Sequence, residues 1–142
     1  AYDLLLKPPH LEPATRLVDR FPNQRFVVDH LAKPAIATET HSPWREDLRE
    51  LARRPNVFCK VSGMVTQAGP GPWSPACFEP YLSVVLEAFG PDRIMIGSDW
   101  PVCTCAADYR TTMQAAIDWA AALSPAERSG FLGGNCASFY RL

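Results

Sequence analysis

The clearest structural signal in the chain is the segment RIMIGSDWP at residues 93–101. Its apolar start, rich in isoleucine, predicts a buried strand at 93–97. Polar residues follow at once, so Asp99 is expected at the semi-buried mouth of that strand. A carboxylate in such a place needs a partner, because burying an unpaired charge is costly. The alternative is an N-cap of the next helix, and several residues separate Asp99 from that helix.

Working outward from this segment, the chain alternates strand and helix throughout. Strands are predicted at 2–6, 25–30, 57–61 and 93–97, and helices at 12–21, 43–53, 75–89 and 106–122. A Gly- and Pro-rich loop is predicted at 66–74, a helix opening with a capping-box pattern at 124–127, and a last short helix at 136–140. This alternation predicts a parallel sheet with right-handed crossovers in a single domain. It leaves open a small doubly wound sheet or half of an eight-stranded barrel.

Composition limits the classes of function that the chain is expected to have. The 142 residues carry a formal net charge of -1 and are 47% hydrophobic, as in soluble globular proteins. No nucleic-acid partner is expected, because phosphate binding needs a basic face. No membrane association is expected, because no apolar run approaches the roughly 20 residues that span a bilayer. Five cysteines without a regular framework predict free thiols in a reducing compartment, so a cytoplasmic protein is expected.

Residues suited to chemistry follow several of the predicted strands, where parallel α/β architectures place their sites. His30 closes one apolar strand, either as a functional group or as a satisfied core histidine. Lys60 lies within another strand, which implies an anionic neighbour or a ligand, unless its stem extends from an edge position. Trp100 is a candidate wall of a substrate pocket, with core packing as the alternative.

Three strand-end motifs and the C-terminal segment carry a family resemblance. They are VDHLAKP at 28–34, KVSG at 60–63, IGSDWPVC at 96–103 and NCASFY at 135–140. Together they closely resemble the amidohydrolase-2 family, and within it the branch of sugar-lactone hydrolases that includes fuconolactonase-like and rhamnonolactonase-like enzymes. The resemblance covers essentially the whole chain. It implies a TIM-type (β/α)₈ barrel, of which residues 1–142 would form a single partial domain: the C-terminal half, about strands 5–8, plus C-terminal helices.

The resemblance also implies roles for individual residues. Asp99 matches the family's strand-8 aspartate, which activates the attacking water and can ligate a divalent metal. His30 matches the strand-6 histidine beside the metal or the substrate carbonyl. These two are therefore the expected catalytic residues and metal ligands, with zinc the first choice of ion. Lys60 matches a lysine typical of the branch, and with Trp100 it is expected to contact substrate. The His-x-His pair that family members carry on strand 1 has no counterpart here.

The expected reaction is hydrolysis of a small sugar-acid lactone. Asp99 would deprotonate water, and His30 or a metal beside it would polarise the carbonyl. Two alternatives stay open: non-oxidative decarboxylation on the same scaffold, and an inactive half-barrel remnant. A half-barrel exposes two unpaired strand edges, which are adhesive. Self-association, or pairing with a missing N-terminal half, is therefore expected.

Overall fold

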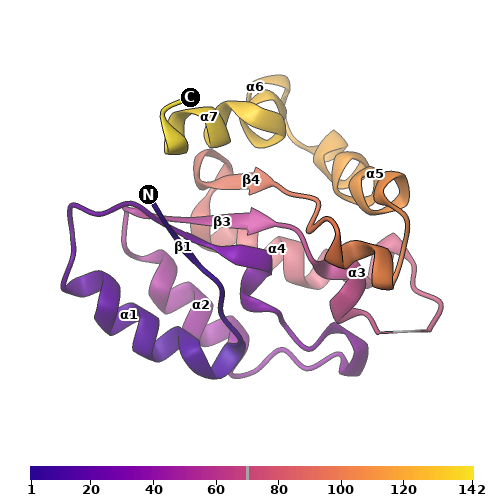
Figure 1. Ribbon diagram of the computed structural model, residues 1–142, viewed down its shortest axis with the longest axis horizontal. Helices are drawn as coiled ribbons and strands as arrows, with labels where there is room; N and C mark the ends of the chain where they lie inside the picture. The colour runs from indigo at the N-terminus through magenta and orange to yellow at the C-terminus, as the bar shows by residue number, and fades with distance from the viewer. Residues whose placement is uncertain (70) are drawn as a thin grey trace.

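The computed structural model describes residues 1–69 and 71–142, and its centre is a parallel sheet of four strands (Figure 1). The strands are β1 (Tyr2–Leu4), β2 (Phe26–Val28), β3 (Val57–Val61) and β4 (Ile94–Ile96), in the spatial order β1-β2-β3-β4. The helices are α1 (Leu11–Asp19), α2 (Trp44–Ala52), α3 (Met64–Gln67), α4 (Glu79–Phe89), α5 (Tyr109–Trp119), α6 (Pro125–Ser129) and α7 (Asn135–Tyr140). Short 3₁₀ turns lie at Pro8–His10, Asp29–Ala32, Ile36–Thr38, Pro75–Phe78, Pro91–Arg93, Val102–Cys105 and Ala120–Ala122, and a π turn lies at Gly130–Gly134. The predicted parallel sheet is confirmed.

Helices α1, α2 and α4 pack side by side against the sheet, and α6 and α7 lie on the opposite side of the molecule, beyond β4 (Figure 1). Leu4, Val28, Cys59 and Ile94 stand in register across the four strands and form a buried row within the main core. These four side chains share one face of the sheet, because side chains alternate along each strand and residues in register point to the same side.

The second face of the sheet is covered in part by α7. Val27 and Met95, which alternate with the main core row, pack against Phe139 of α7. Phe58 of β3 joins them, with its ring centroid 4.8 Å from that of Phe139. The side chains on this face of the sheet therefore pack against α7 at these positions.

Element boundaries depart from the predicted ones where local polar contacts compete with periodicity. The strand predicted at 25–30 ends at Val28, because the backbone turns into left-handed conformations from His30 onward. Helix α5 begins at Tyr109 rather than 106, since the Asp108 carboxylate accepts a hydrogen bond from the Thr111 backbone N–H at 2.8 Å.

The predicted loop and the predicted capping box agree with the structure to different degrees. The predicted loop at 66–74 starts within α3, and its residue 70 lies outside the described residues. The predicted capping box is confirmed: Ser124 accepts from the Glu127 backbone N–H, and the Glu127 side chain accepts from the Ser124 N–H.

Arg93 fastens the start of β4 to the turn before β3. Its Nη1 atom donates to the carbonyl oxygens of Ala52, Arg54 and Val57, each at 3.0 Å. Burial lowers the pKa of this guanidinium. Because each of these carbonyls belongs to the neighbouring β/α unit, Arg93 fixes the relative height of β3 and β4, and with it the strand ends that carry the site.

Within residues 1–69 and 71–142, the helices are too short or too polar to cross a membrane. The five cysteines, all in the described part of the chain, are free thiols.

Candidate active site

His30 and Asp99 meet at the carboxyl ends of β2 and β4. The Nε2 atom of His30 lies 3.4 Å from Oδ1 of Asp99, and the two side chains are only 16% and 11% exposed. Both residues have left-handed backbones, with φ of 55° and 57°. Such conformations cost non-glycine residues about 1–2 kcal/mol each. The structure thus brings together the two residues that the sequence places at strand ends, on backbones held in strained positions.

The left-handed backbone at His30 belongs to a longer feature. Residues His30, Leu31, Ala32 and Lys33 all have positive φ, within and just after the 3₁₀ turn that follows β2. The turn is anchored beneath, since the Trp44 indole donates to the Leu31 carbonyl at 2.6 Å in a buried contact. Backbone strain of this kind persists only where surrounding structure imposes it, and it is concentrated at functional sites.

Ser62 and Gly63, at the end of β3, complete the surroundings of His30. The Ser62 Oγ atom lies 2.7 Å from His30 Nδ1, within hydrogen-bonding distance, and Ser62 is buried. Gly63 has φ of 68°, and a Cβ there would stand 2.8 Å from His30 Cβ and 3.2 Å from Asp99 Oδ2. Sequence reasoning assigned neither residue a role, although the KVSG motif and its place at a strand end were a usable signal.

The charge state of His30 follows from its surroundings. Burial lowers the pKa of His30 below its ordinary value, while the carboxylates of Asp99 and Asp29 act in the opposite direction. The cations of Lys33 and Lys60 add to the lowering. The imidazole is therefore neutral near neutral pH, so it can donate one hydrogen bond and accept another.

Lys60 has the anionic neighbours that its place in a strand implies. Its Nζ atom lies 2.6 Å from Asp3 Oδ2 and 2.9 Å from Asp29 Oδ1. Burial acts to lower the pKa of Lys60, but these carboxylates outweigh it and raise the pKa above its ordinary value. The Tyr140 hydroxyl donates to Asp3, so the cluster ties α7 to β1 and β3. Lys60 is held in ion pairs, and its contact with substrate stays a prediction.

Trp100 lies at the rim of the site. The side chain is 66% exposed, directly after Asp99. The segment beyond it is fixed by backbone bonds, since the Cys103 N–H donates to the Asp99 carbonyl at 2.8 Å. Trp100 thus has the exposure that a wall of an open pocket requires, and its role also stays a prediction.

The donor set at the strand ends fits a metal in part. An imidazole nitrogen and a carboxylate oxygen are zinc donors, and His30 and Asp99 present both to the same space. Among the described residues, however, no group of three or more His, Cys, Asp or Glu side chains is arranged to hold a metal ion. Catalytic zinc takes three protein ligands. The described residues therefore supply part of a site and not a complete one.

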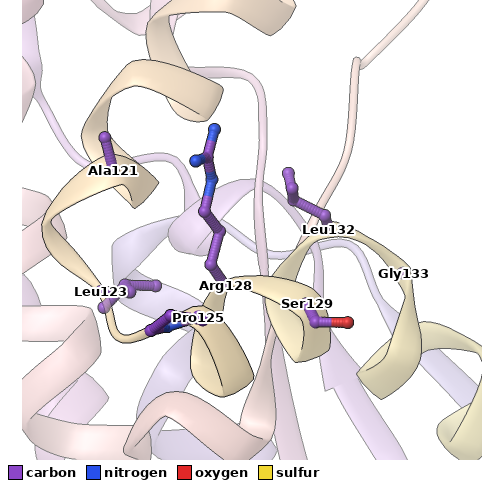
Figure 2. Close-up of a pocket in the computed structure, with 7 residues that line it drawn as sticks. All are labelled: Ala121, Leu123, Pro125, Arg128, Ser129, Leu132 and Gly133. Atoms are coloured by element: carbon purple, nitrogen blue, oxygen red, sulfur yellow. The ribbon is translucent and has the colours of Figure 1, made fainter.

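One large hollow lies elsewhere. It has a volume of about 710 Å³ and is lined by residues following α5 and by α6 and the π turn: Ala121, Leu123, Pro125, Arg128, Ser129, Leu132 and Gly133 (Figure 2). The lining contains none of the residues predicted for the site. The Arg128 side chain extends between Ala121 and Leu132 in this hollow. The candidate site is accordingly defined by the strand ends and not by cavity size.

The sequence is similar to that of known proteins. The sequence pattern of the family described as Amidohydrolase matches residues 2–142. The chain is 40% identical over 147 aligned residues to L-fucono-1,5-lactonase of Burkholderia ambifaria, covering 100% of this chain and 50% of that protein. It is 25% identical to L-rhamnono-gamma-lactonase of Scheffersomyces stipitis, over 66% of this chain and 32% of that one.

A solved structure agrees with the fold. An amidohydrolase from Burkholderia multivorans with bound zinc superposes with a TM-score of 0.93 at 42% identity, covering 99% of this chain and 52% of that one. The chain thus spans about half the length of the relatives it matches. The fold is that of half an amidohydrolase TIM barrel, as the motifs predicted.

Proposed function

The chain belongs to the amidohydrolase family, and on that premise we propose that it carries the His30–Asp99 part of a site that hydrolyses a sugar-acid lactone. The observation that supports this most is the approach of His30 Nε2 to Asp99 Oδ1, 3.4 Å, at the carboxyl ends of β2 and β4, which flank β3. Similarity to two sugar lactonases supports the substrate class. The reaction adds water across one ester bond.

Asp99 is the proposed general base. Its carboxylate takes a proton from water as the water oxygen attacks the lactone carbonyl carbon. The neutral His30 imidazole directs a ring N–H at the carbonyl oxygen and stabilises the negative charge that develops there. The bond to the ring oxygen then breaks, and the proton held by Asp99 passes to the departing alkoxide. The product is the open hydroxy acid, and Asp99 and His30 return to their starting states.

A divalent cation, zinc by first choice, belongs to the proposal as a partner of the completed site. In that form of the site, His30 Nε2 and Asp99 would provide two of its ligands, and the histidine proton would lie on Nδ1 instead of Nε2. The remaining ligands would come from further β/α units. When bound, such a cation would polarise the lactone carbonyl. No step above is routed through it, because the described residues do not complete its ligand set.

We propose that the active unit is a completed barrel in a cytoplasmic setting. The edges of the described sheet are β1 and β4, and strands at open edges pair readily with other chain. The partner would be a further set of β/α units or a second copy of this chain. Lys60 and Trp100 are proposed to border the substrate, a small molecule that enters at the strand mouths.

The test is hydrolysis of a panel of sugar-acid lactones. We would assay this chain alone and co-expressed with the half of the Burkholderia ambifaria lactonase that it does not cover. Acid release from L-fucono-1,5-lactone by the co-expressed pair is expected, at a rate above that of either half. Carbon dioxide release from aromatic acids, without lactone hydrolysis, would instead favour the decarboxylase alternative. Absence of both activities from a folded pair would favour the inactive remnant.

A further inference from the structure

Ser62 is placed to control the His30 ring. Its hydroxyl lies 2.7 Å from His30 Nδ1, and Ser62 is only 3% exposed. Among the described residues, the Ser62 hydroxyl has His30 as its side-chain hydrogen-bond partner. A buried hydroxyl of this kind needs that bond, because leaving it unmade costs about 1–3 kcal/mol.

Two glycines make room for this contact. A Cβ on Gly97 would lie 3.1 Å from Ser62 Cβ and 3.3 Å from Ser62 Oγ. A Cβ on Gly63 would lie 2.8 Å from His30 Cβ. The ends of β3 and β4 thus carry glycine at the two positions where a side chain would displace Ser62 or His30. The contact is held by the packing of three strand ends and not by one flexible side chain.

The partners at the two ring nitrogens decide where the proton sits. Asp99, a carboxylate, faces Nε2 and can only accept a hydrogen bond, whereas the Ser62 hydroxyl at Nδ1 can donate or accept. The neutral ring therefore carries its proton on Nε2, and Ser62 donates to Nδ1. This tautomer aims an N–H at the space in front of Asp99.

We propose that, in the metal-free site, Ser62 is a positioning residue that fixes the rotation and the Nε2–H tautomer of His30, and that Gly97 provides the space that Ser62 requires. The inference deepens the proposed function and rests on it, because the N–H has catalytic value only if the site hydrolyses a lactone. The ring geometry itself does not depend on any activity.

The experiment is long-range ¹H–¹⁵N correlation spectroscopy on the ¹⁵N-histidine-labelled chain, above the pH at which histidine titrates. Its histidines are His10, His30 and His41, and the His30 signals are identified by their loss in His30→Gln. The wild-type spectrum is expected to show the proton on Nε2 of His30. In Ser62→Ala, the Nδ1 signal should move downfield as its donor is lost. Gly97→Ala should disturb the same signal although the hydroxyl is retained.

Controls separate positioning from general damage. Thr15→Ala removes another buried hydroxyl, one that donates to Leu11 O within α1. Gly71→Ala adds a methyl group where no atom lies within 4 Å. Neither should move the His30 signals. A wild-type His30 with its proton on Nδ1, or unchanged His30 signals in both Ser62→Ala and Gly97→Ala, would overturn the proposal.

Activity gives a second readout. In the completed enzyme, Ser62→Ala should lower kcat by about 10- to 100-fold with little change in KM, as for other residues that orient a catalytic histidine. A rise in KM with kcat unchanged would contradict a positioning role. If the expected tautomer is found in a pair that hydrolyses no lactone, the proposed function fails and the role of Ser62 in orienting the ring stands.

Discussion

Gly63 and His30 pack so closely that a methyl group on Gly63 would stand 2.8 Å from the Cβ of His30. The same methyl group would lie 3.2 Å from Asp99 Oδ2, and the backbone there has φ of 68°. Both side chains of the candidate site therefore rest against a position that only glycine fills without strain.

Gly63→Ala should destabilise the chain. The left-handed backbone alone costs alanine about 1–2 kcal/mol, and displacement of His30 adds to this. Chemical denaturation monitored by tryptophan fluorescence would measure the loss. Gly71→Ala is the matched control, because a Cβ at that position meets open space. Equal midpoints for Gly63→Ala and the wild type would contradict the described contact.

Arg93→Lys should also destabilise the fold, although charge is conserved. Lysine lacks the guanidinium fork, and its ammonium ends one bond short of the position of Nη1, which contacts the carbonyls of Ala52, Arg54 and Val57. It also has no counterpart of Nη2, which donates to the Ala88 carbonyl. The expected loss in the free energy of unfolding is about 2 kcal/mol. Arg53→Lys, at a side chain that is 77% exposed, should change it little. A loss of equal size in both variants would show that the Arg93 fork is not responsible.

The candidate site should make stability depend on pH. Because the pKa of His30 is lowered in the folded chain, the unfolded chain takes up a proton first as pH falls below about 6.5. The free energy of unfolding should therefore decline between that pH and the lower folded pKa. Urea titrations across this range should show a smaller decline for His30→Gln, and His10→Gln is an exposed control. The same slope in His30→Gln and the wild type would count against this.

How much the sequence predicted depended on the range of the interactions involved. The bounds of β3, 57–61, were predicted residue for residue, and the Ser124–Glu127 capping box was also foreseen. Both depend on neighbouring residues. The convergence of His30 and Asp99 followed from a rule about parallel strands rather than from local pattern.

Long-range contacts escaped prediction. The identity of the Lys60 partners, Asp3 and Asp29, depends on which side chains face one another across the sheet. The Ser62 bond to His30 depends on the left-handed backbone at His30, and the residue type at that position does not predict this conformation. The packing of α7 on the second sheet face depends on the course of the chain after α5.

The open sheet edges predict association. β1 and β4 each have one strand neighbour among the described residues, so the purified chain should form dimers or larger species as concentration rises. Static light scattering over a dilution series would follow this. A mass that stays at 15.7 kDa, that of one chain, at high concentration would contradict the proposed pairing.

The most direct test of the central claim is the rate of lactone hydrolysis by the completed barrel with and without the Asp99 carboxylate. Asp99→Asn keeps the size of the side chain and removes the base, so the rate should fall by about 10²- to 10⁴-fold. Asp92→Asn, an exposed carboxylate in the turn before β4, should retain the wild-type rate. A wild-type rate in Asp99→Asn would contradict the assignment of Asp99 as the group that activates water.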